Sequence, residues 1–169
     1  SQIASAQVKS AVLLAALGSN KPTSFIEPVL SRNHTEIMLK ALGVPINTEK
    51  LKTTISKITK QLKPFNFNIP GDPSSAAFFA GAASMVKNSN LVLKNISGND
   101  TRLGIFSILK QMGVTVLKSN KKNILGEKII DITVKNKRLN GIKINENQIP
   151  SIIDEIPIIA IIASQAKGQ

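Results

Sequence analysis

The feature that most constrains the fold of this chain is an internal repeat. An apolar, helix-like stretch opens with Ser5-Ala6, and another opens 70 positions later with Ser75-Ala76. A second kind of helix-like stretch ends at Gly43-Val44 in one copy and, again 70 positions later, at Gly113-Val114 in the other. Because spacing and order agree, each copy is predicted to fold as one supersecondary unit.

Each copy is predicted to contain a helix, a strand, a helix and two more strands, in that order. Short β-type runs at residues 24–30 and 90–96 lie between the two helices of each copy, and strand-like sequence follows each Gly-Val pair. A third copy is expected to open at Asp154. Further strand candidates are Lys50–Thr59, Pro64–Ile69, Ile129–Val134 and Gly141–Ile144.

The two kinds of helix differ in where their apolar residues lie. The first kind, SAQVKSAVLLAAL and SAAFFAGAASMV, is apolar on nearly every side and is predicted to be buried all round. The second kind is amphipathic, and Glu36 and Lys40 are expected to pair on its polar face. Gly43 and Gly113 fit left-handed C-caps. Buried helices beside half-solvated sheets predict a layered α/β fold, divided at residues 68–73, NIPGDP.

Charge and composition narrow the classes of partner. A net charge of +12 favours anionic partners: nucleic acid, an anionic membrane or phosphorylated metabolites. The lysines are scattered and Trp and Tyr are absent, which disfavours nucleic acid. The absence of cysteine and the single His34 disfavour disulfides and most metal sites. The longest apolar run, residues 156–163, is too short to span a membrane.

The start of the first helix is the leading candidate for an anion site. The first amides of a helix have no intrahelical partner and lie at the positive end of its dipole. With the Ser5 hydroxyl and the Gln7 amide, this end would suit a phosphate or carboxylate. Alternatively, Ser5 only caps the helix.

Two further candidates carry charge. Arg32 precedes the amphipathic helix and could bind a phosphate or carboxylate in bidentate fashion, or could be a solvated surface residue. Asp154 and Glu155 precede an apolar helix, where an acid either caps the helix or serves as a general base.

Other polar residues near helix starts favour structural roles. Asp72, followed by Pro73, fits an N-cap whose charge would repel an anion. Asn33 with Glu36 has the spacing of a capping box, Asp100 fits another cap, and Arg102 is expected to pair with nearby acids.

Five ordered motifs together resemble one family over essentially the whole chain. The chain is similar to an interior segment of the 5-enolpyruvylshikimate-3-phosphate synthases. The sequences of its motifs are similar to those of the bacterial class associated with glyphosate insensitivity. Asn33 and Asp100 depart from the residues that the family often has there. The motifs are SAQVKSAVLLAAL, SRNHTEIMLKALG, PGDPSSAAFF, NDTRLGIFSILKQMG and PSIIDEIPIIAIIA.

The resemblance implies a fold and a division of the chain. The family fold is an inside-out α/β barrel of repeated βαβαββ units, with buried helices and outward-facing mixed sheets, and it would be incomplete here. Residues 1–69 would be the last, partial unit of one lobe. Residues 70–169 would be the first unit of the other lobe plus the opening helix of the next unit.

The resemblance also implies an activity. The family moves the enolpyruvyl group of phosphoenolpyruvate to the 5-hydroxyl of shikimate 3-phosphate and releases phosphate, without a metal or organic cofactor. Ser5, Ala6, Gln7 and Arg32 match substrate-binding positions, and Asp154 matches the substrate-contacting acid that acts as base. A cytoplasmic, monomeric full enzyme with no nucleic-acid or membrane partner is expected. The segment alone is expected to be inactive, because the family's other charged site residues lie outside it.

Two alternative functions stay open at this point. One is a related enolpyruvyl transferase that acts on UDP-N-acetylglucosamine. The other is a basic, non-catalytic module that binds nucleic acid or another partner, which predicts lysines clustered on one face.

Overall fold

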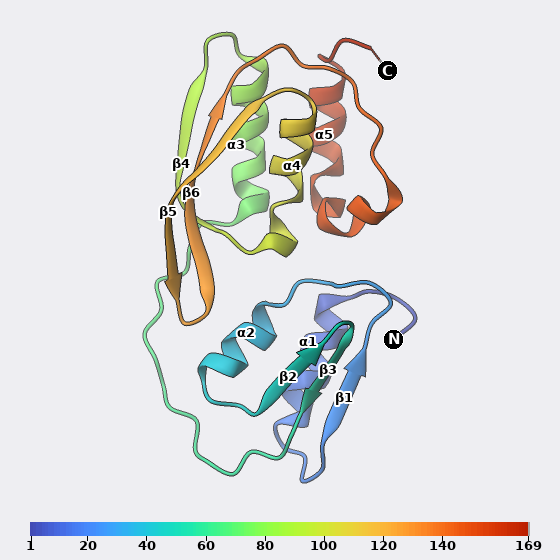
Figure 1. The fold of residues 1–169 in the computed structure, drawn as a ribbon, viewed down its shortest axis with the longest axis vertical. Coiled ribbons are helices and arrows are strands. Elements are labelled where there is room, and N and C mark those ends of the chain that lie inside the picture. Colours follow the sequence, from blue (N-terminus) through green and yellow to red (C-terminus); the bar gives the residue numbers. More distant parts are fainter. Residues whose placement is uncertain (169) are drawn as a thin grey trace. The chain divides into compact units, whose positions relative to one another are not determined.

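The computed structural model describes residues 1–168, which divide into two compact units (Figure 1). Unit 1 comprises Ser1–Asn68 together with Leu125–Glu127. Unit 2 comprises Ile69–Ile124 and residues 128–168. Each unit has its own hydrophobic core, so each is described by itself.

Unit 1 is one three-stranded sheet with two helices. The sheet has the strand order β1-β3-β2 and is antiparallel throughout. Helix α1 packs against β1, and α2 packs against β2. The elements confirm the predicted order of helix, strand, helix, strand, strand. They are α1 (Ala6–Ala16), β1 (Thr23–Ile26), α2 (His34–Ala41), β2 (Ile46–Glu49) and β3 (Lys52–Ile55).

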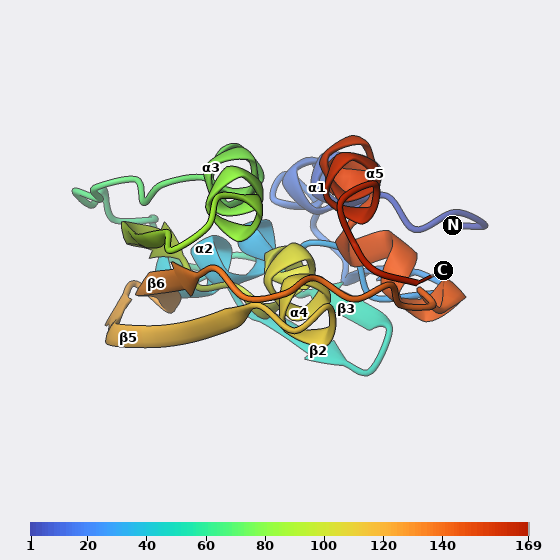
Figure 2. The same cartoon turned by 90° about the horizontal axis from the view of Figure 1, so that it is seen from above.

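Unit 2 repeats this order and adds one more helix. Its sheet has the strand order β4-β6-β5, with β4 antiparallel to β6. Helix α3 packs against both β4 and α5, and Figure 2 shows α3, α4 and α5 nearly end-on. The elements are α3 (Pro73–Met85), β4 (Asn90–Ser97), α4 (Gly104–Gln111), β5 (Thr115–Ile124), β6 (Glu127–Lys135) and α5 (Ile156–Ala163). Short 3-10 turns cover Asp100–Arg102, Glu146–Ser151 and Ile153–Glu155.

Two strand predictions were wrong, and a third was correct in place but too long. Within the predicted strand Lys50–Thr59 only β3 (Lys52–Ile55) forms, and Lys50, with a φ of 53°, lies in the turn between β2 and β3. Residues 64–69, which begin with a proline, form no regular element. Residues 141–144 alternate like a strand but form none; one bridge, between Asn140 and Lys167, lies beside them.

The prediction that the first helix of each copy is buried all round was also wrong for this chain. In α1, Leu13 is fully buried, whereas Leu14 is 53% exposed. In α3, Ala77 is fully buried, whereas Phe78 and Phe79 are 60% and 65% exposed. The reason is geometric: a helix packed on the elements of one unit is covered on one side only.

The turns after the amphipathic helices confirm the predicted C-caps. Gly43 and Gly113 have φ values of 87° and 99°, in the left-handed region that favours glycine. The chain then turns back, and Val44 and Val114 enter the cores of their own units. The same local sequence therefore ends the same helix in both copies.

Candidate functional site

The start of α1 has the geometry of a capped helix. Ser5 is the N-cap, and its Oγ accepts a hydrogen bond of 3.3 Å from the backbone N–H of Val8. The Ser5 hydroxyl also donates to Gln7 Oε1 at 3.3 Å. The predicted capping role is confirmed, and it uses only one of the four first-turn amides that lack an intrahelical partner. Ser5 and Ala6 are half-buried and Gln7 is exposed, so this helix end can still meet a ligand.

Arg32 lies in the loop between β1 and α2 and is half-buried. A carboxylate at the end of β1 holds this loop. Glu27 Oε2 accepts hydrogen bonds from the backbone N–H of Ser31 at 3.2 Å and from the Ser31 hydroxyl at 2.5 Å. The backbone that carries Arg32 is therefore fixed at the residue immediately before it.

A buried lysine joins this loop to α1. Lys9 is fully buried, and its Nζ lies 2.8 Å from Glu27 Oε1 and 2.8 Å from Glu36 Oε1. Glu27 and Glu36 are only 3% and 7% exposed. The Lys9–Glu27 contact is also a hydrogen bond, whereas neither oxygen of Glu36 accepts one from the described residues, so that pair is held by charge. We call these three residues the Lys9 cluster.

The Lys9 cluster overturns two expectations for α2. Glu36 faces inward toward Lys9, so it does not form the predicted surface pair with Lys40. For the same reason it does not complete a capping box with Asn33, which occupies the N-cap position without a side-chain capping bond. A buried cation attracts the carboxylate more strongly than either local partner does.

Asp154 belongs to unit 2 and lies in the 3-10 turn Ile153–Glu155, immediately before α5. Its side chain is exposed, while that of Glu155 is 5% exposed. Glu155 is the N-cap residue of α5, although its side chain makes no capping bond. Instead, Glu155 Oε1 accepts a hydrogen bond of 2.5 Å from the Ser74 hydroxyl, which ties the turn to the start of α3.

Arg102 also binds Ser74, and so adds a third side chain to this contact between the turn and α3. Arg102 Nη2 donates to Ser74 Oγ at 2.8 Å and to Asp72 Oδ1 at 2.5 Å, so the predicted pairing of Arg102 with an acid is confirmed. Asp72 caps α3 as predicted, accepting from the Ser75 amide at 2.9 Å. The turn that presents Asp154 is therefore held by a chain of polar contacts within unit 2.

The predicted cap at Asp100 was wrong by one residue. Asn99 Oδ1 accepts from the backbone N–H of Thr101 at 3.0 Å and caps the 3-10 turn. Asp100 instead pairs with Lys128 Nζ at 2.6 Å on the surface. The side-chain amide of Asn99, rather than the carboxylate of Asp100, is placed to bind the backbone of the turn.

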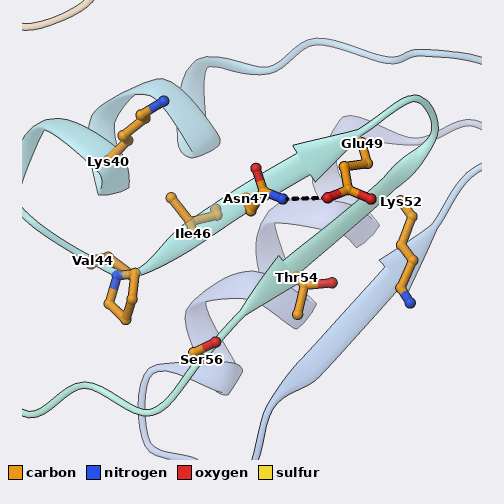
Figure 3. Close-up of a pocket in the computed structure, with 9 residues that line it drawn as sticks. Lys40, Val44, Ile46, Asn47, Glu49, Lys52, Thr54 and Ser56 are labelled. Carbon is orange, nitrogen blue, oxygen red and sulfur yellow. Dashed lines mark hydrogen bonds between the residues drawn. The ribbon is translucent and has the colours of Figure 1, made fainter.

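Two hollows lie away from the predicted site residues. In unit 1, a hollow of about 560 Å³ lies beside β2 and β3. Figure 3 shows the residues that line it, among them Asn47, whose Nδ2 donates to Glu49 Oε1. The length of this hydrogen bond is 2.9 Å. In unit 2, a hollow of about 410 Å³ has four lysines in its lining. These are Lys118, Lys121, Lys122 and Lys128. Some lysines are therefore gathered on one surface of unit 2.

Among residues 1–168, no group of three or more His, Asp or Glu side chains is placed to hold a metal ion. No helix within the same residues is both long and apolar enough to cross a membrane.

Comparison with known proteins places the chain in a family. The family described as EPSP synthase (3-phosphoshikimate 1-carboxyvinyltransferase) matches residues 1–169. The chain belongs to the EPSP synthase family. A 3-phosphoshikimate 1-carboxyvinyltransferase from Petrotoga mobilis is 50% identical over 167 residues, covering 99% of this chain and 39% of the relative. One from Sulfurihydrogenibium sp. is 48% identical over 169 residues, with 98% and 39% covered.

A solved structure supports the same assignment. The EPSP synthase from Acinetobacter baumannii matches with a TM-score of 0.90 and 42% identity, over 98% of this chain and 38% of that chain. The predicted fold class, an incomplete inside-out α/β fold, is confirmed. The chain spans about 39% of the length of the curated EPSP synthase relatives that it matches.

The sequence motifs alone do not identify Lys9 and Glu27 as residues that hold the loop of Arg32. Lys9 lies inside the motif SAQVKSAVLLAAL, and Glu27 lies in a predicted strand. The available signal was a lysine within a helix predicted to be buried, because a buried lysine needs a carboxylate partner. The identity of that partner depends on the tertiary fold.

Proposed function

We propose that the full-length protein that carries this chain transfers the enolpyruvyl group of phosphoenolpyruvate to the 5-hydroxyl of shikimate 3-phosphate and releases phosphate. The observation that carries the proposal is the start of α1, where Ser5 and Gln7 are hydrogen-bonded to each other beside first-turn amides, in a unit that also carries Arg32. Membership of the EPSP synthase family supports it. On this proposal the chain supplies part of the active site.

The proposed roles follow from the chemistry of each group. Ser5, Ala6 and Gln7 bind the phosphate of shikimate 3-phosphate, because helix-start amides, a hydroxyl and an amide donate to anionic oxygens. Arg32 binds beside the shikimate ring, where a guanidinium can donate two parallel hydrogen bonds. Asp154 contacts the shikimate substrate and acts as general base, because it is an exposed carboxylate on a turn that polar contacts hold in place.

The proposed reaction is an addition followed by an elimination. Asp154 takes the proton of the 5-hydroxyl as that oxygen bonds to C2 of phosphoenolpyruvate, and the methylene carbon gains a proton from a donor outside this chain. The product of this step is a tetrahedral ketal phosphate. Loss of a proton from the new methyl group and of phosphate from C2 then forms the enol ether. The proposed reaction uses no cofactor.

The charge of the chain fits these substrates. Both are polyanions, and a net charge of +12 would speed their encounter with the site. We also propose that the full-length protein acts as a monomer in the cytoplasm. The 169-residue chain alone is proposed to be inactive, because it spans about 39% of its relatives.

The decisive experiment is a phosphate-release assay on the full-length protein with phosphoenolpyruvate and one acceptor at a time. Turnover with shikimate 3-phosphate, and none with UDP-N-acetylglucosamine, is the expected result. Turnover with UDP-N-acetylglucosamine but not with shikimate 3-phosphate would contradict the proposal and would identify the protein as the related transferase. The four lysines beside the hollow of unit 2 make nucleic-acid binding a measurable second candidate. Steeply salt-dependent oligonucleotide binding without turnover would favour that candidate.

A further inference from the structure

We propose that Lys9 is a positioning residue, which sets the loop that carries Arg32 at one fixed place relative to the Ser5–Gln7 helix start. This inference rests on the proposed function, since it names what aligns two parts of the proposed substrate site. Lys9 itself is fully buried and is not proposed to touch substrate. It acts through Glu27, Ser31 and the backbone that leads to Arg32.

The first step of the argument is the place of Lys9 on α1. Its backbone N–H donates to the carbonyl of Ser5 at 3.0 Å, so Lys9 lies one helical turn after the N-cap. Residues four apart share one face of a helix. Because the Lys9 side chain is fully buried and contacts Glu27 and Glu36, it links these partners to the helix start that carries Ser5 and Gln7.

The second step is the reach of the Lys9 ammonium. It contacts Glu27, which follows β1, and Glu36, which lies in the first turn of α2, both at 2.8 Å. Arg32 lies between these two glutamates in the sequence. One cation thus fixes both ends of the segment that carries Arg32.

The third step is the use of both oxygens of Glu27. Oε1 accepts from Lys9, while Oε2 accepts from the amide and the hydroxyl of Ser31, the residue before Arg32. A carboxylate that bridges a buried ammonium and a loop amide transmits position, because neither contact can shift without loss of the other. Ser10 Oγ and Thr35 Oγ1, 2.6 Å apart, add an uncharged tie between α1 and α2 that leaves the loop itself untouched.

The cost of burial favours a positioning role over simple stabilisation. Burial of an ammonium and two carboxylates loses their hydration, so such a cluster stabilises a fold poorly compared with apolar residues of similar volume. What it does supply is one defined geometry. A site that holds a rigid phosphorylated ring needs such geometry, because misplacement of a binding group by about 1 Å weakens its contribution strongly.

The test compares Lys9→Met with Leu13→Ala in the full-length protein. Methionine keeps the length of the lysine and removes its charge, whereas Leu13 is equally buried, one turn further along α1. At a temperature where both variants are folded by circular dichroism, Lys9→Met is expected to weaken shikimate 3-phosphate binding at least tenfold by calorimetry and to raise its KM by a similar factor. Leu13→Ala is expected to change both by less than about twofold. Equal losses of affinity for shikimate 3-phosphate in Lys9→Met and Leu13→Ala would overturn the inference.

A double-mutant cycle tests the route through Arg32. If Lys9 acts through Arg32, Lys9→Met is expected to cause little further loss of affinity in an Arg32→Ala background. The same loss in both backgrounds would overturn the inference. If Lys9→Met does not fold, Glu27→Ala takes its place in the cycle. Glu27→Gln is the conservative control, because its amide oxygen can still accept from Ser31, and it is expected to lose much less affinity than Glu27→Ala.

A readout without substrate separates this inference from the proposed function. The amide of Ser31 is expected to exchange its hydrogen at least tenfold faster in Lys9→Met than in Leu13→Ala, because its bond to Glu27 is weakened. If the wild-type protein fails to bind shikimate 3-phosphate, the proposed function fails and the exchange result decides on Lys9. Unchanged exchange at Ser31 would overturn the positioning role in either case.

Discussion

Arg102 Nη2 lies 2.5 Å from Asp72 Oδ1, and the other oxygen of the same carboxylate caps α3 by accepting from Ser75. One side chain thus caps the start of a helix and binds a cation 30 residues away. In unit 1, Glu27 likewise uses one oxygen for Lys9 and the other for Ser31. In both units a carboxylate with two functions fixes the backbone near a proposed site residue.

Asp72 is expected to make stability depend on pH in the acid range. Partial burial acts to raise the pKa of Asp72, but hydrogen bonds from Ser75 and the charge of Arg102 outweigh it and hold the pKa below its ordinary value. Stabilisation by a group with a lowered pKa is complete above its unfolded pKa, about 3.9, and is lost as pH falls through its folded pKa. Thermal unfolding of the full-length protein should show Asp72→Asn less stable than wild type at pH 7, with the difference shrinking below about pH 4.

The matched control for Asp72 is Asp100→Asn. Asp100 also forms an ion pair, with Lys128, but its side chain is 73% exposed. Loss of this ion pair in Asp100→Asn is expected to lower the free energy of unfolding by less than about 1 kcal/mol at pH 7. Asp72→Ala, which also removes the cap, is expected to cost about 1–2 kcal/mol. A difference between wild type and Asp72→Asn that does not change with pH would contradict the prediction.

Gly104→Ala is expected to destabilise unit 2 through a close backbone approach. A Cβ at this position would lie 2.4 Å from the carbonyl oxygen of Ser151 and 2.6 Å from Ile152 Cγ2, so the turns that carry Asp154 would have to move. We expect a loss of about 1–3 kcal/mol by denaturant unfolding, together with a lower kcat. At Gly18 the nearest atom, the Ala15 carbonyl oxygen, would be 3.8 Å away, so Gly18→Ala should be near neutral. Similar losses at both positions would refute the steric argument.

The exposed phenylalanines of α3 are expected to limit the solubility of the 169-residue chain. Phe78 and Phe79 are 60% and 65% exposed, and adjacent apolar rings on a surface favour association. The double substitution Phe78→Ser/Phe79→Ser should raise the concentration at which light scattering first detects aggregates. Its cost in the isolated chain should be no more than about 1 kcal/mol. Ala77→Ser, at a fully buried position of the same helix, should not improve solubility. If both variants begin to aggregate at the same concentration, the exposed phenylalanines do not limit the solubility of the chain.

Asp154→Asn is expected to separate chemistry from binding in the full-length protein. Asparagine keeps the shape of the side chain but cannot take a proton, so kcat should fall by about 10²–10⁴. Shikimate 3-phosphate binding by calorimetry should stay within about twofold of wild type. Asp100→Asn, at another exposed carboxylate of unit 2, should leave kcat unchanged. Near-normal turnover of Asp154→Asn would remove Asp154 from the role of base.

Arg32→Lys is expected to raise the KM for shikimate 3-phosphate about tenfold or more. Lysine keeps the charge but not the planar fork that donates two parallel hydrogen bonds. Arg138→Lys, which changes an arginine of unit 2, serves as the control and should leave KM within about twofold. Equal effects of the two substitutions would show that only net charge matters at Arg32.

The sequence by itself determined the features that depend on neighbouring residues. The caps at Ser5 and Asp72 and the left-handed turn at Gly43 all involve contacts within about five positions. Such contacts are set by local geometry and propensity, so the residues alone predict them. Strands are different, because a strand needs a partner, and residues 64–69 and 141–144 have strand-like sequence without a strand.

Only the tertiary structure decided the partners of the buried Lys9 and the half-buried Arg102. Lys9 meets Glu27 from 18 positions away, and Arg102 meets Asp72 from 30 positions away. It also decided which side of α1 is covered, leaving Leu14 exposed beside the buried Leu13. The physical reason is that a desolvated charge binds whichever opposite charge the packed chain brings within reach, and packing depends on the whole unit rather than on any short segment.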